Sequence, residues 1–323
     1  MPFAYVLRRL LQVVPVVLAI AVLNFFLLRL APGDMADVMA GEAGAATPEY
    51  LAQLRAQFGI DQPLGTQFAS YIGKLLRLDL GWSFRNGQSV ISLILERLPA
   101  TALLMILSLA LATAIGCALG TLAGATRWRW LDMTISTVAT VGFATPLFWL
   151  GLMLIVLFSV RLGWLPSSGM VTLGVTQTGW TRVIDVARHL VLPAACLTVY
   201  YIAIYARLMR TSVSEVSRLD FVRTARAKGL TSGATLRGHI VPNALLPIVT
   251  MTALQFGALF SGSVAIETVF GWPGLGQLAL SAVTSRDLNL LLGILFVSSL
   301  FVLLVNLLTD LVYAWFDPRV ELK

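Results

Sequence analysis

The chain has little charge for its length. Of its 323 residues, only 12% are Asp, Glu, Lys or Arg, whereas 58% are apolar. Charged residues make up roughly a quarter of an ordinary soluble domain, so the composition excludes that class. It indicates an all-α protein that crosses a membrane several times, because only helices and closed barrels span a bilayer.

Cysteine and histidine are also scarce. The two cysteines, Cys117 and Cys196, lie inside apolar runs, which argues against a disulfide framework and against a zinc site. The two histidines, His189 and His239, are expected on opposite sides of the membrane, so they do not form a pair of metal ligands. We therefore expect no metal site and no cofactor bound by this chain.

Motifs of common enzymes are missing. The chain has no GxxxxGK(S/T) phosphate loop, so we do not expect it to bind ATP in the usual way, and it has no HExxH. The stretch Gly81-Trp82-Ser83-Phe84 mimics the GxSx of intramembrane serine proteases, but no histidine-bearing span can supply the base. No catalytic residue is expected.

The net charge of +7 raises the possibility of nucleic acid as a partner. The basic residues, however, cluster beside the apolar runs, as the topology of a membrane protein requires. Membrane lipid is therefore an expected partner, and nucleic acid is not.

Six apolar runs are each long enough to span a bilayer, which takes about 20 residues. They are Leu10–Leu30, Ala100–Ala125, Met133–Val160, Leu190–Met209, Leu245–Ile266 and Leu290–Phe316. Arg8 and Arg9, Arg127 and Arg129, and the basic residues of Arg207–Arg237 all fall on one side if the six runs are spans. The positive-inside rule makes that side cytoplasmic, and both termini with it.

This topology divides the chain into four parts. Residues 1–31 form an N-terminal anchor helix, 32–98 an external insertion between the first two spans, 99–316 a five-helix core, and 317–323 a cytoplasmic tail. The insertion has a helical pattern that begins at Thr47-Pro48-Glu49 and ends at Gly59, and a second apolar segment at Phe68–Leu78. The strings FGIDQPL and LDLGWSF within it resemble those of peptide permeases, which implies an external subdomain that faces a solute-binding protein; a packing cap over the bundle is the alternative.

One long polar, basic stretch, Ser212–Pro247, interrupts the apolar second half; we call it the basic segment. Asp220 can cap a helix through Lys228, which Gly229 would end in the left-handed conformation. Thr231 or Ser232 can cap a second helix, which Pro242 would end or kink. The charge alone is also compatible with a plain cytoplasmic loop.

The basic segment resembles the EAA motif of the membrane subunits of ABC importers, in its dipeptide, oligopeptide and nickel permease variant. The general motif is Glu-Ala-Ala, three residues, Gly, nine residues, then Ile-x-Leu-Pro. Here it is Arg223-Thr224-Ala225, three residues, Gly229, nine residues, then His239-Ile240-Val241-Pro242. The leading Glu is replaced by Arg223, as is usual in peptide permeases with a string similar to FVRTARAKGL.

In such permeases this stretch docks on a cytoplasmic ATPase. The resemblance therefore implies an ATPase-coupling role for Asp220, Phe221, Arg223, Thr224, Ala225, Arg226, Lys228, Gly229 and Pro242.

A second motif, Glu267-Thr268-Val269-Phe270-Gly271-Trp272-Pro273-Gly274-Leu275-Gly276, resembles the ETVF-x-x-PGLG signature of the same family. Its glycines and proline predict an irregular loop at the outer rim. Glu267, Gly271, Pro273, Gly274 and Gly276 are thus expected to shape the outer mouth, and a direct solute contact is the alternative.

Polar or helix-breaking residues inside the spans are candidates for the translocation path. Pro146 removes a backbone donor and predicts a kink or an opening near mid-membrane, which either lines a path or serves packing. The candidates are Thr145, Pro146, Tyr201, Gln255, Ser261 and Asn306.

The resemblance runs from YVLRRLLQ at Tyr5 to FDPRV at Val320. It implies a permease subunit of an ABC importer in a bacterial inner membrane, carrying peptides or a related small solute. Its partners would be a second homologous permease subunit, two ATPase subunits that bind ATP and Mg, and an external solute-binding protein. An ATP-independent channel is the alternative from another class, although the spans lack a charged ring or a TVGYG-like filter.

Overall fold

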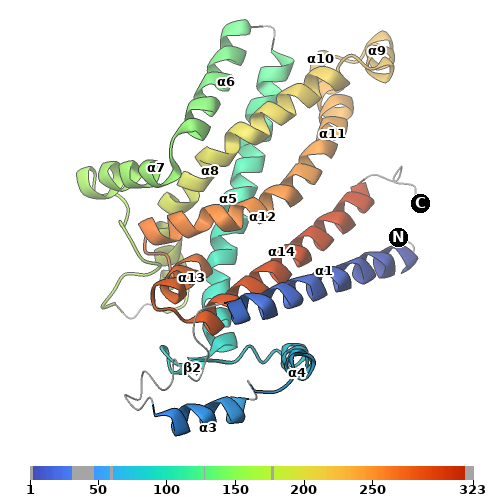
Figure 1. Ribbon diagram of the computed structural model, residues 1–323. Coiled ribbons are helices and arrows are strands. Elements are labelled where there is room, and N and C mark those ends of the chain that lie inside the picture. The colour runs from blue at the N-terminus through green and yellow to red at the C-terminus, as the bar shows by residue number, and fades with distance from the viewer. Residues whose placement is uncertain (1–2, 31–46, 59–60, 127, 176–177, 317–323) are drawn as a thin grey trace. The chain divides into compact units, whose positions relative to one another are not determined.

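A computed structural model describes residues 3–30, 47–58, 61–126, 128–175 and 178–316 (Figure 1). The proposed tail at 317–323 and the first part of the insertion, 32–46, lie outside these residues. The chain forms two compact units, one built mainly on Arg97–Leu280 and the other on Leu7–Glu96 with Ser281–Phe301. We describe each unit by itself.

The described residues are mostly helical. The elements at the N-terminal side are α1 (Phe3–Leu30), α3 (Pro48–Phe58), α4 (Leu64–Leu76), β1 (Trp82–Ser83), β2 (Gln88–Ser89), α5 (Val90–Ala125), α6 (Arg129–Ala144), α7 (Leu147–Leu154) and the π-helical η1 (Ile155–Arg161). There follow α8 (Trp180–Val216), α9 (Asp220–Ala227), α10 (Ser232–Thr235), the π-helical η2 (Leu236–Ile240), α11 (Val241–Ala244), α12 (Leu246–Val269), α13 (Leu275–Thr284) and α14 (Leu288–Phe316).

Three helices, α5, α8 and α14, are long and apolar enough to cross a membrane. Two bent pairs raise the number to five if each is one span: α6 with α7 and η1, and Ser232–Ala244 with Leu246–Gly257. Over Leu11–Leu27, α1 counts only as a shorter apolar helix. The structure thus agrees with an all-α membrane protein, whereas the number of six spans stays a prediction.

The third expected span, Met133–Val160, is broken rather than continuous. The helices on either side of the break are bent by 100°. Thr145, which ends α6, is extended, with φ −74° and ψ 129°, and Pro146 precedes α7. A residue before proline is driven out of the α region by the proline ring, so the bend follows from Pro146, as the sequence predicts.

Helices α5 and α8 approach each other closely through three glycines. A Cβ at Gly116 would lie 2.6 Å from Cβ of Tyr205, and one at Gly124 would lie 2.9 Å from the carbonyl oxygen of Arg210. Gly120 lies between them and faces Ala206 and Met209. The matched order of contacts along both helices makes the pair parallel. Small residues at i, i+4 and i+8 allow such contact, as at other membrane helix interfaces.

The unit built on Leu7–Glu96 and Ser281–Phe301 holds the described part of the insertion. One cluster of its core is formed by Ala21 of α1, Leu75 of α4 and Phe296 of α14, with partly buried apolar neighbours around them. The hydroxyl of Ser83 on β1 donates to a carboxylate oxygen of Asp287 at 2.5 Å, and the other Asp287 oxygen accepts from the backbone N–H of Leu290 at the start of α14. The insertion is therefore packed on α1 and α14, and its expected role as a surface that faces a solute-binding protein stays a prediction.

Candidate functional site

The basic segment folds into short helices beside the end of α8, and α9 begins one residue earlier than expected. Leu219 is the N-cap and makes no side-chain capping bond, so Asp220 is the first residue of the helix instead of its cap. The Asp220 carboxylate contacts Arg223 at 3.3 Å, and both side chains are largely exposed. In the first turn of α9, the negative charge of the Asp220 carboxylate is stabilised by the positive end of the helix dipole.

Helix α9 is held by one narrow face. Val222 is fully buried and Ala225 is 5% exposed. Phe221 has the i,i+4 spacing from Ala225 that favours a shared buried face, but it is 42% exposed. The buried stripe is therefore Val222 with Ala225 at i,i+3, since a helix of two turns can bury only one stripe. Arg223, Arg226 and Lys228 remain exposed beside Phe221.

The turn after α9 confirms two expectations. Gly229 has φ +85°, and a Cβ there would meet nothing within 4 Å, so glycine is required for the backbone conformation alone. The backbone N–H groups of Gly229 and Leu230 donate to Arg226 and Ala225 and close α9. Thr231 caps the next helix, because its hydroxyl accepts from the N–H of Ala234 at 3.3 Å.

Pro242 does not end the second helix of the segment. The chain continues from α10 through η2 into α11, with Pro242 in the first turn of α11. Proline has no N–H to donate to the preceding turn, and the wider π-helical turn before it accommodates this loss. The Asn243 side chain donates to the carbonyl of His239 at 2.7 Å. The bend of 42° lies at Leu245, just before Pro247.

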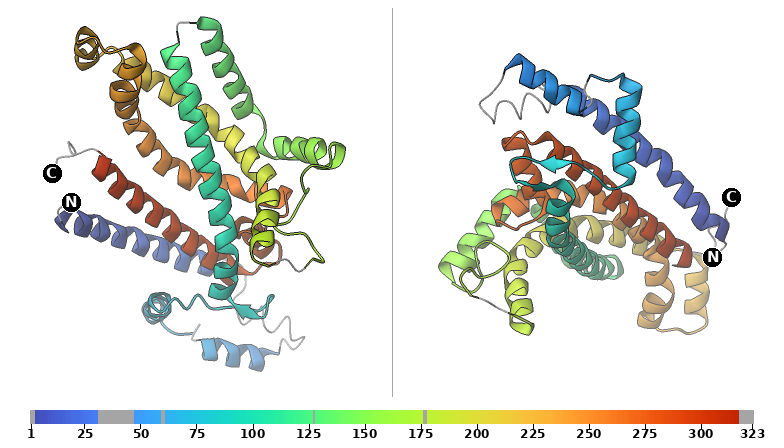
Figure 2. Two further views of the ribbon diagram at one scale, coloured as in Figure 1. Left: turned by 180° about the vertical axis from the view of Figure 1, so that it is seen from behind. Right: turned by 90° about the horizontal axis from the view of Figure 1, so that it is seen from below.

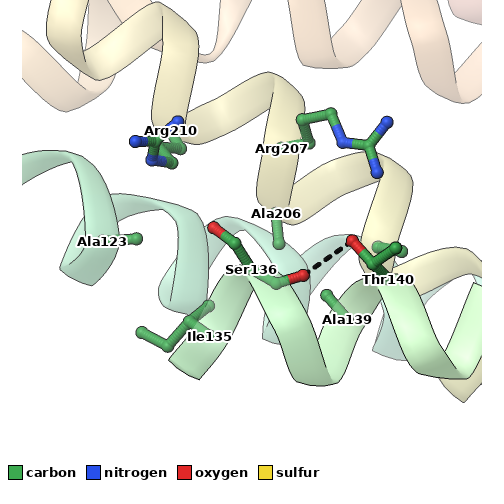
Figure 3. A pocket seen from close by; sticks show the side chains of 9 residues that line it. Ala123, Ile135, Ser136, Ala139, Thr140, Ala206, Arg207 and Arg210 are labelled. Atoms are coloured by element: carbon green, nitrogen blue, oxygen red, sulfur yellow. Dashed lines mark hydrogen bonds between the residues drawn. The ribbon is translucent and has the colours of Figure 1, made fainter. Parts of the chain in front are cut away.

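A small cleft opens between α5, α6 and α8 (Figure 3). Its volume is about 180 Å³, and its lining is Ala123, Ile135, Ser136, Ala139, Thr140, Ala203, Ala206, Arg207 and Arg210. Arg210 forms a two-pronged ion pair with Asp132 of α6, including a bond of 2.6 Å from Nη2 to Oδ2. Sequence reasoning missed this pair, because its members are 78 residues apart and carry no shared motif.

The second motif is organised around a fully buried carboxylate. Glu267 accepts from the hydroxyl of Thr101 on α5 at 2.7 Å and from the backbone N–H of Gln277 at 3.0 Å. Thr101 in turn accepts from the N–H of Leu275 at 2.7 Å, and the Trp272 indole donates to the carbonyl of Ala100 at 2.9 Å. Thr101 and Trp272 were not among the predicted site residues, although a polar residue in the first apolar turn of a span is a usable signal.

The loop of this motif is shorter than expected. Glu267 still belongs to α12, and Gly276 already belongs to α13, so only 270–274 are irregular. Gly271 has φ +57°. A Cβ at Gly274 would collide with the Glu267 carboxylate, and one at Gly276 would lie 2.7 Å from Cα of Val264. Gly274 and Gly276 are thus required by the buried carboxylate and the helix beside it. The expected role of Glu267, Gly271, Pro273, Gly274 and Gly276 at an outer mouth stays a prediction.

Among the candidate path residues whose side chains the structure describes, no hydrogen bond joins one to another. Thr145 bonds within α6, to the carbonyl of Val141 at 2.8 Å. Tyr201 and Gln255 are buried on α8 and α12. The side-chain oxygen of Asn306 is buried without a partner among the described residues, and the Ser261 side chain lies outside them. Their role in a path stays a prediction.

The start of α6, the end of α8 and the α9–α10 turn lie at one end of their unit, and the start of α13 lies at the other (Figure 1 and the left view of Figure 2). The basic segment and the cleft therefore share one end, and the Glu267 cluster occupies the opposite one.

Comparison with known proteins identifies two family models. The model described as "Binding-protein-dependent transport system inner membrane component" matches residues 116–322. The model for the N-terminal part of such membrane components matches residues 2–105. Together they cover almost the whole chain.

Curated relatives match over nearly their full length. A di/tripeptide transport system permease protein, DppB, of Pseudomonas aeruginosa is 37% identical and covers 98% of each chain. The dipeptide transport system permease protein DppB of Escherichia coli is 37% identical and covers 99% of each. Among solved structures, an inward-facing MetNI methionine ABC transporter has a TM-score of 0.57 at 20% identity, over 70% of this chain and 96% of that one, which shows a shared fold.

Proposed function

Because the chain belongs to the family of binding-protein-dependent transport system inner membrane components and is a permease subunit of an ABC importer, we propose that it imports short peptides. The proposal rests on the relatives, two of which are named as dipeptide and di/tripeptide permeases. The family consists of membrane components of binding-protein-dependent transport systems, which favours the transporter over the ATP-independent channel.

The basic segment is the surface through which an ATPase subunit drives this permease. The observation that carries this step is α9, a two-turn helix that is anchored by Val222 and Ala225 and presents Phe221 with three basic side chains outward. An exposed aromatic ring surrounded by cations fits an apolar groove with an acidic rim, because aromatic and Arg residues dominate binding energy at interfaces. Asp220, Thr224 and Gly229 shape this surface.

The segment is connected so that its displacement reaches the membrane helices. It leaves α8 at Val216 and returns through η2 and α11 into α12, and α12 packs against α8. Neither connection is a long flexible loop: the turn before α9 is 217–219, and Leu245 alone separates α11 from α12. A push on α9 is therefore delivered to two packed helices.

The remaining assembly follows from the same proposal. The chain has no phosphate-binding loop of its own, so two separate ATPase subunits bind ATP and Mg. A second homologous permease subunit completes the pathway, and an external binding protein delivers the solute. In the proposed topology, the chain crosses the inner membrane of a bacterium six times and has both termini in the cytoplasm. The parallel α5 and α8 support it, because the second and fourth of six successive spans run in the same direction.

The experiment has two parts. The first is co-purification of the ATPase with the full-length chain, and the second is ATP-dependent uptake of a labelled dipeptide in proteoliposomes that hold the complete assembly, with its second permease subunit and its binding protein. Phe221→Ala is the test variant and Leu173→Ala, which truncates an apolar side chain that is 92% exposed outside the segment, is the control. With 42% of the Phe221 side chain available for burial, docking loses up to about 2 kcal/mol at roughly 25 cal/mol per Å².

The two parts of the proposal have separate outcomes. Equal ATPase retention by Phe221→Ala and Leu173→Ala refutes α9 as the docking surface. Normal ATPase binding with no ATP-dependent uptake of any dipeptide refutes the peptide assignment alone.

A further inference from the structure

The cleft between α6 and α8 carries a positive charge that no described residue neutralises. Arg210 is paired with Asp132, whereas Arg207 is exposed and makes no hydrogen bond or ion pair in the described part of the chain. Figure 3 shows both arginines projecting from α8 over Ser136 and Thr140 of α6. A guanidinium in this position favours an anion with several oxygens, which its planar donors match well.

The position of the cleft along the helices fits the surface of a bilayer. Trp128 and Trp130 flank the start of α6, stack with ring centroids 5.9 Å apart, and are more than half exposed. Tryptophan is enriched at the level of lipid headgroups. At 1.5 Å per residue, Ser136 lies roughly 9 Å deeper than Trp130. The long arginine side chains can reach from this depth toward the interface.

The lining of the cleft is polar at the arginines and apolar elsewhere. Ala139, Ala203 and Ala206 are small, and together with Ile135 they leave an apolar trough. The volume of about 180 Å³ is below the range of about 300–1,000 Å³ typical of small-molecule pockets. The cleft is large enough for a phosphate group and the first carbons of an acyl chain, whose remainder can extend into the surrounding bilayer.

We propose that this cleft binds the phosphate of an acidic phospholipid, with Arg207 as the principal cation, the Ser136 hydroxyl as a donor, and the alanine-lined trough holding the acyl chain. Arg210 lines the edge of the site, but its charge is already paired with Asp132. The inference does not depend on which solute is carried or on how the ATPase docks.

The test is native mass spectrometry of the full-length chain in detergent, titrated with phosphatidylglycerol, with phosphatidylcholine of the same acyl chains, and with inorganic phosphate alone. Arg207→Gln removes the charge, and Arg207→Lys keeps it. The control is Arg182→Gln, which removes the same exposed charge at the other end of α8.

The wild type and Arg182→Gln are expected to retain phosphatidylglycerol in preference to phosphatidylcholine. Arg207→Gln lowers phosphatidylglycerol affinity about fivefold, since one basic residue at a membrane surface contributes roughly 1 kcal/mol, and Arg207→Lys restores most of it. Equal retention by the two Gln variants overturns the proposal. Phosphate binding that depends on Arg207 without any preference for phosphatidylglycerol overturns it in favour of a free-anion site.

Discussion

Replacement of Gly229 by alanine isolates the contribution of one backbone conformation to the basic segment. The residue has φ +85°, and an added Cβ meets no atom within 4 Å, so the substitution introduces no clash. The left-handed conformation costs a residue with a Cβ about 1–2 kcal/mol. The loss of glycine's freedom in the unfolded chain offsets about 0.4–1 kcal/mol of this. We expect a net local destabilisation of about 1 kcal/mol.

Gly233 provides the matched control in the same segment. It lies in α10, has no positive φ, and also leaves open space for a Cβ. Gly233→Ala should therefore stabilise the segment by about 0.5–1 kcal/mol, because glycine inside a helix is less favourable than alanine by that amount. The two variants change the same atoms and are predicted to have opposite signs.

Hydrogen exchange of the backbone amides measures this directly, since a short helix opens locally before the whole protein unfolds. The amides of Lys228, Gly229 and Leu230 close α9 by hydrogen bonds to residues within it. Their exchange should be about fivefold faster in Gly229→Ala, as 1.4 kcal/mol corresponds to a factor of ten, and slower in Gly233→Ala. The same direction of change in both variants, or no change in Gly229→Ala, would refute the reasoning.

Three further predictions concern the helix contacts. Glu267→Ala should lower the melting temperature, because Thr101 and the N–H of Gln277 lose their acceptor and each buried group left without a partner costs about 1–3 kcal/mol. Glu267→Gln keeps an acceptor oxygen and should lose less; equal losses would contradict the network. Gly120→Val should destabilise by about 1–3 kcal/mol through overpacking against α8, and Ala118→Val on the exposed face should not. The Asp132–Arg210 pair is partly exposed, so a double-mutant cycle in thermal unfolding should yield less than about 1 kcal/mol of coupling; a larger value would show that the pair is shielded from solvent.

The features that the sequence predicted well are those with a local cause. Pro146 breaks its helix because proline acts on its immediate neighbour, and Gly229 ends α9 because only glycine readily adopts its conformation. Helix α3 begins at Pro48 and ends at Phe58, as its start and stop residues predict. Family membership likewise followed from motifs that are contiguous in the chain.

The features that escaped prediction depend on contacts between distant residues. The spacing of Phe221 and Ala225 could not reveal that Val222 would be the buried residue, because the neighbouring helices decide which stripe of α9 is covered. The Asp132–Arg210 pair and the bond of Thr101 to Glu267 join residues far apart in the chain. Pro242 was expected to end or kink a helix, but a π-helical turn accommodates its missing donor and the helical run continues through it.

The three glycines of α5 have a mechanical consequence. At Gly116, Gly120 and Gly124, α5 has no side chain, and its backbone lies directly against backbone and Cβ atoms of α8. Two helices in such contact can neither slide nor rotate past one another without a collision of main-chain atoms. We expect the two helices to move as one rigid body, because they are in close contact over about 12 Å of their length. A tilt imposed on α8 near Val216 should therefore tilt α5 by the same angle.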